Sequence, residues 1–106
     1  MSNADPKLQH IIQILKDEFH PKRVLLFGSR ARGNHQYDSD YDLLIIGDNS
    51  PLPKIEKMQR ASDLLYPLGV TADVFFYSEN EFNDWKDEFS SIPEVAQREG
   101  RELDLG

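Results

Sequence analysis

Three short apolar runs, separated by segments with a helical repeat, constrain the fold of this chain more than any other feature. The first run spans Arg23–Phe27 and stops at Gly28, and the second spans Tyr41–Ile46 and stops at Gly47. The third, Val70–Tyr77, is rich in β-branched and aromatic residues. Runs this short and this apolar are typical of buried strands, so we expect three strands in one small sheet.

The segments between the runs carry helix signals. Asp5 is a suitable N-cap before Pro6, and His20 and Pro21 are expected to end the helix that follows. Ser50 and Pro51 repeat the start signal before the third run. The apolar positions of these two helices recur at helical spacing: Leu8, Ile11, Ile12, Leu15 and Phe19 in the first, and Leu52, Ile55, Met58, Ala61 and Leu65 in the second. Alternating helices and strands predict an α/β domain around a small central sheet.

The segment after Ser78 has aromatic and aliphatic residues at spacings that predict one or two short helices covering the sheet. Pro93 lies near a predicted helix start and Gly100 near its end. The residues concerned are Phe82, Trp85, Phe89, Ile92 and Val95. Packing in the core is the favoured role of the three aromatic residues, and a protein interface is the alternative.

Length and charge limit the classes of function. The 106 residues suit one compact core, so residues 5–106 are predicted to form a single domain, and residues 1–4 resemble a cloning remnant or a disordered terminus. The net charge is −7, from 12 basic and 19 acidic residues. We therefore expect no direct nucleic-acid binding, and a bound nucleotide would need metal ions. There is no cysteine and no long apolar run, which favours a cytoplasmic protein that does not insert into a membrane.

Gly28 and Ser29 stand where the first strand meets a predicted helical turn, Ser29 to Gly33. A glycine there lets the backbone approach a ligand closely, and the amides at a helix start together with a serine hydroxyl can hold a phosphate. The alternative is an ordinary strand-to-helix turn capped by a serine.

Three aspartates follow in the next two strands. Asp40 and Asp42 flank Tyr41 at the entrance of the second strand, and alternation places both carboxylates on one face about 7 Å apart, an arrangement that suits bound Mg²⁺. Asp73 is the one charged residue of the third run. If the second and third strands are neighbours, Asp73 completes a three-carboxylate cluster that binds the catalytic metal. The alternatives are a solvated acidic loop for the pair and a locally bonded residue for Asp73.

The combination of these residues resembles a known family. Gly28 to Gly33 reads GSRARG, ten residues separate Ser29 from Asp40, and the Asp-x-Asp pair is followed by an aspartate on a later strand. This arrangement is similar to the signature of the DNA polymerase β nucleotidyltransferase superfamily, and most similar to its smallest branch, the minimal MNT-type domains. The resemblance extends roughly from residue 8 to residue 77.

The resemblance implies a mixed β-sheet flanked by helices, the polymerase β-like nucleotidyltransferase fold, and Mg²⁺-dependent transfer of AMP from ATP. It assigns the outer phosphates to Gly28 and Ser29, the metals to Asp40 and Asp42, and activation of the acceptor to Asp73, also a metal ligand. Two arginines have less certain roles. Arg30 and Arg32 either touch phosphate or form ion pairs, and for Arg32 an ion pair with Asp38 or Asp40 is favoured.

The same resemblance implies a partner. MNT-type domains typically pair with a HEPN-domain protein in a toxin and antitoxin module and adenylylate one of its tyrosines. The main alternative is a non-catalytic antitoxin or nucleotide-binding module that neutralises its partner by contact. Transfer to a small hydroxylated molecule ranks third, since such relatives usually carry an additional domain.

Overall fold

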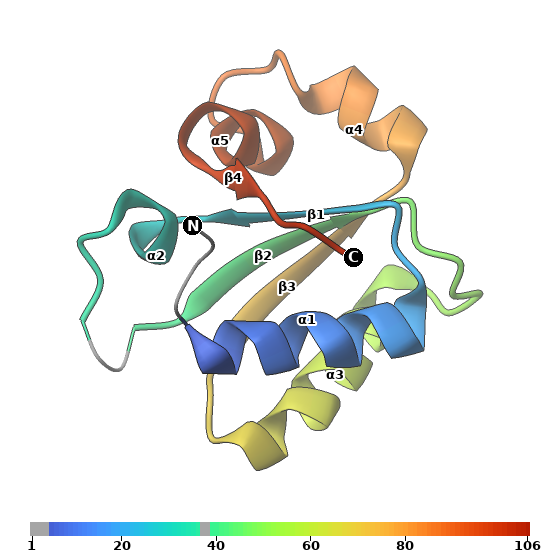
Figure 1. The fold of residues 1–106 in the computed structure, drawn as a ribbon. Coiled ribbons are helices and arrows are strands. Elements are labelled where there is room, and N and C mark those ends of the chain that lie inside the picture. Colours follow the sequence, from blue (N-terminus) through green and yellow to red (C-terminus); the bar gives the residue numbers. More distant parts are fainter. Residues whose placement is uncertain (1–4, 37–38) are drawn as a thin grey trace.

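The computed structural model describes residues 5–36 and 39–106, which form a four-stranded sheet with helices on both faces (Figure 1). The described elements, in chain order, are α1 (Pro6–Phe19), β1 (Arg23–Phe27), α2 (Ser29–Arg32), β2 (Tyr41–Ile46), α3 (Lys54–Leu65), the 3₁₀ helix η1 (Tyr66–Leu68), β3 (Ala72–Tyr77), α4 (Glu79–Trp85), α5 (Ile92–Glu99) and β4 (Arg101–Glu102). All three strands expected from the sequence are present, and β3 begins two residues later than expected.

The strands lie in the order β3-β2-β1-β4. Strand β2 runs antiparallel to β1 and parallel to β3, and the short β4 adds antiparallel to the other side of β1. The parallel step is made by α3, which carries the chain back between β2 and β3. The sheet is therefore mixed, as predicted, whereas β4 was not anticipated because a two-residue strand leaves no alternating pattern to detect.

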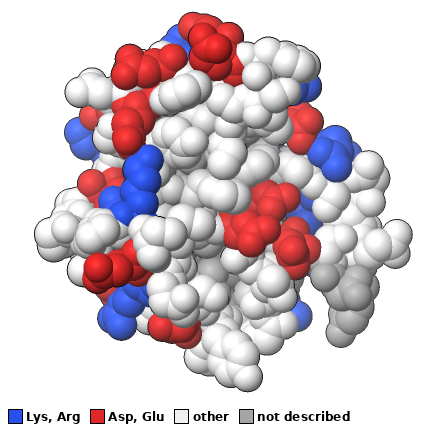
Figure 2. All heavy atoms as spheres, turned by 180° about the vertical axis from the view of Figure 1, so that it is seen from behind, with Lys and Arg blue, Asp and Glu red and all other residues white. Residues whose placement is uncertain are grey.

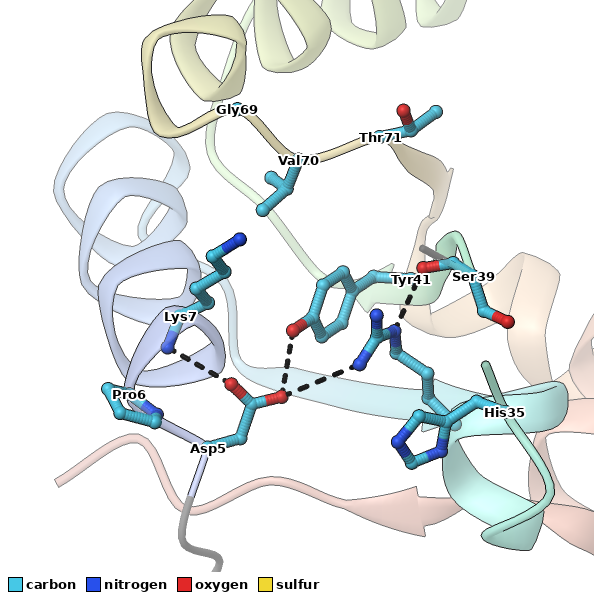
Figure 3. A pocket seen from close by; sticks show the side chains of 10 residues that line it. Asp5, Pro6, Lys7, His35, Ser39, Tyr41, Gly69, Val70 and Thr71 are labelled. Atoms are coloured by element: carbon cyan, nitrogen blue, oxygen red, sulfur yellow. Dashed lines mark hydrogen bonds and ion pairs between the residues drawn. The ribbon is translucent and has the colours of Figure 1, made fainter. Parts of the chain in front are cut away.

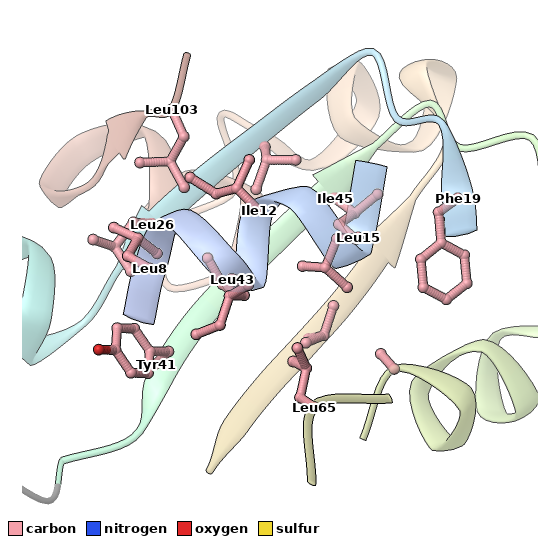
Figure 4. Packing of buried hydrophobic residues seen from close by; sticks show 14 of the residues in the cluster. Leu8, Ile12, Leu15, Phe19, Leu26, Tyr41, Leu43, Ile45, Leu65 and Leu103 are labelled. Carbon is pink, nitrogen blue, oxygen red and sulfur yellow. The ribbon is translucent and has the colours of Figure 1, made fainter. Parts of the chain in front are cut away.

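One face of the sheet packs against α1 and α3 and forms the larger core. Helix α1 begins where Asp5 accepts hydrogen bonds from the amides of Lys7 and Leu8, and it ends where His20 takes a left-handed conformation with φ 47°. The predicted stripe of five α1 residues is fully buried against alternate residues of the strands (Figure 4). Leu103, just beyond β4, joins the same core.

The opposite face is covered by α4 and α5, which pack on Leu25, Phe27, Leu44 and Ile46 through buried Phe82 and Ala96, among others. Helix α4 begins with a capping box between Ser78 and Glu81, and α5 is capped by Ser91 and has Pro93 in its first turn. Two short helices over the sheet match the expectation for this segment.

The predicted apolar face of α3 is wrong in its first half. Of the five apolar positions, Ala61 and Leu65 are buried, but Ile55 is 76% exposed and Leu52 lies before the helix begins. Lys57 takes the inward position instead, where its ammonium group lies 3.0 Å from a carboxylate oxygen of Asp48. This pairing compensates the Asp48 carboxylate, whose side chain is 4% exposed and would be costly without a partner.

The aromatic tail also departs from its favoured role. Phe82 is buried in the core, but Trp85 is 50% exposed and Phe89 is 80% exposed. The Arg98 guanidinium covers part of the Phe89 ring, at 5.5 Å from its centroid. Two large aromatic side chains therefore face solvent. Within the described residues, no helix combines the length and the apolar character needed to cross a bilayer.

Candidate active site

Gly28 and Asp42 pack directly against each other at one end of the sheet. Phe27 pairs with Asp42 across β1 and β2, so the turn that follows β1 lies beside the start of β2. Gly28 has φ 73°, and a β-carbon placed there would overlap the Oδ2 atom of Asp42. Only glycine leaves space for this carboxylate against the turn, which ties the two parts of the motif together.

Asp42 and Asp73 lie side by side on adjacent strands. They are register partners in the parallel β2–β3 pair, where neighbouring strands are about 4.8 Å apart. Alternation places both on the α4–α5 face, because Tyr41 and Leu43 before and after Asp42 are buried in the α1–α3 core. Burial raises the pKa of Asp42 above its ordinary value, and the negative charges of Asp73 and Asp40 raise it further.

Asp40 and Ser29 border this pair. Asp40 is exposed and directly precedes β2, near enough for its charge to act on Asp42. Ser29 is the first residue of α2 and follows Gly28 directly. The amides of Ala31 and Arg32 donate to the carbonyl oxygen of Gly28 within this turn. The donors that the start of α2 brings to the acidic pair are therefore the hydroxyl and the amide of Ser29.

Arg32 and Glu99 complete the charged surroundings. The Arg32 guanidinium lies 2.7 Å from Glu99 at the end of α5, so the expected pairing with Asp40 is wrong, and Asp38 lies outside the described residues. The positive charge of Arg32 lowers the pKa of Asp42, while Glu99 raises it. Sequence reasoning missed Glu99, because only the fold brings the end of α5 to the start of β2.

The donor set fits a metal that shares its ligands with a substrate. Among the described residues, no group of three or more His, Asp or Glu side chains is placed to hold a metal ion, so Asp40, Asp42 and Asp73 do not form an all-protein cage. Mg²⁺ seldom uses such cages in proteins, since it keeps water and substrate phosphates alongside one or two carboxylates. Burial raises the pKa of Asp42 most, and the negative charge of Asp73 raises it further. Two carboxylates that repel each other in this way favour a cation between them.

A cavity opens at the same end of the sheet but belongs to the other face. Its volume is about 760 Å³, and its lining includes Asp5, Lys7, Arg30 and Tyr41 (Figure 3). Tyr41 faces this cavity's side of β2, whereas Asp42 faces away from it. The cavity is therefore separate from the acidic pair.

Acidic side chains gather in compact groups on the side of the molecule that is turned away in Figure 1. One such group lies near the middle of that side, with basic side chains on either hand (Figure 2). Together with the net charge of −7, this distribution repels free phosphate groups.

A glycine-serine turn packed against an Asp-x-Asp strand, with a third aspartate on the neighbouring parallel strand, is the arrangement of a nucleotidyltransferase. Comparison with protein families gives the same class. The chain belongs to the polymerase β nucleotidyltransferase family, whose model, described as "Polymerase beta, Nucleotidyltransferase", matches residues 9–91.

Two curated proteins of Methanocaldococcus jannaschii (strain ATCC 43067 / DSM 2661 / JAL-1 / JCM 10045 / NBRC 100440) are similar in sequence. "Putative protein adenylyltransferase MJ0604" is 31% identical over 83 residues, which cover 76% of this chain and 80% of that protein. "Putative protein adenylyltransferase MJ1379" is 33% identical over 63 residues, 58% of this chain and 63% of that protein.

A solved structure has the same fold. It is described as "Crystal structure of the toxin-antitoxin with AMP-PNP", and it superposes with a TM-score of 0.69 at 18% identity, covering 96% of this chain and 75% of that one. The predicted nucleotidyltransferase fold is confirmed.

Proposed function

We propose that this protein is an Mg²⁺-dependent adenylyltransferase that moves AMP from ATP onto a hydroxyl group of a partner protein. The observation that carries the proposal is the Asp42–Asp73 pair beside the Gly28–Ser29 turn. Family membership supports nucleotidyl transfer, and the names of the two archaeal relatives support a protein as the acceptor.

The residues divide the chemistry between them. Asp40, Asp42 and Asp73 hold Mg²⁺, which when bound neutralises the triphosphate and the charge that develops on it. The hydroxyl and the amide of Ser29, at the start of α2, bind the outer phosphates. Asp73 takes the proton of the acceptor hydroxyl, whose oxygen bonds to the α-phosphorus. The bond from that phosphorus to the bridging oxygen breaks, and pyrophosphate leaves.

The acceptor is proposed to be a tyrosine of a HEPN-type toxin, which makes this chain an antitoxin. The toxin-antitoxin structure with a similar fold supports this setting, as does the resemblance of the motif to MNT-type domains. The cytoplasm is the compartment that fits such a partner.

The test is transfer from α-labelled ATP to a co-expressed partner, with the added adenylyl group located by mass spectrometry. Wild type is expected to label the partner with Mg²⁺ and not in EDTA. The combined Asp40→Ala and Asp42→Ala variant should lose labelling, while Asp17→Ala combined with Asp63→Ala, two exposed acids that each accept a hydrogen bond from a glutamine side chain, should retain it. Undiminished labelling by the Asp40 and Asp42 variant would refute the proposal.

Neutralisation by contact alone is a second candidate, and the exposed Trp85 and Phe89 favour it. Large exposed aromatic residues are frequent anchors in protein interfaces. Asp73→Asn distinguishes the two candidates, because it removes the proposed base and leaves those aromatic residues in place. Loss of rescue by Asp73→Asn with partner binding intact supports chemistry, and equal rescue supports contact.

A further inference from the structure

Three side chains, those of Asp5, Arg30 and Tyr41, contact one another at the start of β2, on the face of the sheet opposite the acidic pair. Tyr41 lies between Asp40 and Asp42, and its side chain points to the opposite face of the sheet from Asp42. Its hydroxyl donates a hydrogen bond of 2.7 Å to Oδ2 of Asp5, the residue that also caps α1. The start of β2 is thereby tied to the start of α1.

Arg30 holds the same segment from α2. Its guanidinium lies over the Tyr41 ring, 4.0 Å from the centroid, and its Nε donates a 3.0 Å hydrogen bond to the carbonyl oxygen of Ser39. A terminal nitrogen of Arg30 is also 3.8 Å from Oδ2 of Asp5. Figure 3 shows these contacts meeting beside the cavity. Arg30 therefore contacts Ser39 and Tyr41, the residues that precede and follow Asp40 in the sequence.

The position of Arg30 argues against a phosphate contact. Its side chain is only 11% exposed and lies on the Tyr41 face, whereas Asp42 and Asp73 lie on the other face of β2 and β3. The planar guanidinium is already used in stacking and in a backbone hydrogen bond. These are geometric uses that a lysine ammonium does not reproduce.

We propose that Arg30, with Asp5 and Tyr41, forms a brace that fixes the backbone of Ser39–Asp42, so that Arg30 is a positioning residue for the Asp-x-Asp carboxylates rather than a ligand of the triphosphate. The brace is present in the free protein, and only its effect on nucleotidyl transfer rests on the proposed function. Because Ser29 and Arg30 are consecutive, one short helix positions both the phosphate turn and the acidic strand.

Amide hydrogen exchange tests the brace without metal, nucleotide or partner. The Tyr41 amide donates to the carbonyl oxygen of Thr71 at 3.0 Å and reports on the strand entrance, while the Ile45 amide reports on the far end of β2. In Arg30→Lys, exchange at Tyr41 should rise about tenfold or more relative to exchange at Ile45. Unchanged exchange at Tyr41, or equal acceleration at both amides, would overturn the proposal.

Arg23→Lys is the matched control. Arg23 also stacks on an aromatic ring, that of Phe82 at 5.2 Å, and also donates to a carboxylate, that of Glu102. It stands at the far end of β1, opposite Ile46. Arg23→Lys should leave exchange at Tyr41 unchanged. An equal rise in Arg23→Lys would show that losing any stacked arginine loosens the sheet, which also overturns the proposal.

Kinetics separates a brace from a phosphate ligand. Arg30→Lys should lower kcat with KM for ATP within about twofold, and its loss should not add to that of Tyr41→Leu when the two are combined, because both remove the same support. A raised KM, or losses that add, would assign Arg30 to the nucleotide instead. Absence of transfer in wild type would reject the proposed function, and the exchange experiment would still decide the brace.

Discussion

Gly28 combines a backbone conformation that is essentially restricted to glycine, φ 73° and ψ −158°, with a direct approach to the Asp42 carboxylate. Gly28→Ala should therefore destabilise the fold by more than the roughly 1–3 kcal/mol of backbone strain alone, because the new methyl group must also displace Asp42. Nucleotidyl transfer should be lost as well. Denaturant unfolding together with the labelling assay would measure both effects.

Gly33 offers the control for this substitution. It also has a positive φ, 84°, but a β-carbon there would have no atom within 4 Å. Gly33→Ala should cost only the conformational strain and keep transfer. Equal losses in the two variants would show that contact with Asp42 plays no part.

The raised pKa of Asp42 predicts how it affects stability. A carboxyl group whose pKa is raised by folding is harder to ionise in the folded chain. The contribution of Asp42 to the stability of the metal-free protein is therefore lost as pH rises from the ordinary aspartate range through the raised value. Asp42→Asn removes this cost. In EDTA at neutral pH the variant should unfold at a higher temperature than wild type, although it should lose transfer.

Thermal unfolding between pH 4 and 7 would check the sign, with Asp17→Asn, an exposed acid on α1, as control. The control should follow the wild-type curve. A lower midpoint for Asp42→Asn at pH 7 would mean that the carboxylate is stabilising.

The sequence indicated which residues form the acidic site, but not which contacts hold their strand in place. Gly28, Asp42 and Asp73 could be placed because strand alternation and one neighbouring pair of strands are enough to bring them together. Asp5 was predicted only as a helix cap, although it also accepts a hydrogen bond from the hydroxyl of Tyr41, 36 residues away in sequence. Contacts over such separations depend on how elements cross, which periodicity does not encode.

At the scale of elements, α3 is anchored by the Lys57–Asp48 ion pair, whose side chains are 13% and 4% exposed. Truncating one member of a buried pair leaves the other charge without its partner. Lys57→Met should therefore cost about 3 kcal/mol in the free energy of unfolding. Urea unfolding would measure it.

Lys54→Met provides the comparison, because Lys54 pairs with Glu81 while both side chains are nearly half exposed. Surface pairs of this kind contribute less than about 1 kcal/mol. If the two variants unfold at the same urea concentration, the Lys57 pair is no more important than a surface pair.

The same ion pair explains where prediction of the elements failed. Strands β1 and β2 and helix α1 were predicted correctly, since each has one wholly apolar run or stripe. In α3 the apolar residues Ile55 and Met58 suggested a face that the structure leaves largely exposed. A largely buried lysine is invisible to an apolar repeat, and its partner Asp48 lies nine residues away in the sequence, before the helix begins.

At the scale of the whole molecule, the net charge of −7 means that cations stabilise the folded chain in two ways. Sodium screens the surface charge generally, whereas Mg²⁺ should also bind at the acidic pair. At equal ionic strength, MgCl₂ should therefore raise the unfolding temperature more than NaCl. Thermal unfolding in the two salts measures the difference.

Combining Asp42→Asn with Asp73→Asn should abolish this extra stabilisation and leave the sodium effect in place. If the doubly substituted chain still prefers Mg²⁺, the ion binds elsewhere on the molecule.

Strand β3 is the outermost strand on its side of the sheet, and Asp73 is exposed on it. An open strand edge can accept a strand from another molecule, and charged side chains discourage such addition. Removing the charge of Asp73 therefore has two effects: it takes away a proposed catalytic group, and it lowers a barrier to aggregation. Samples of Asp73→Asn should be monitored for oligomers by light scattering, since a loss of activity in them can arise from self-assembly.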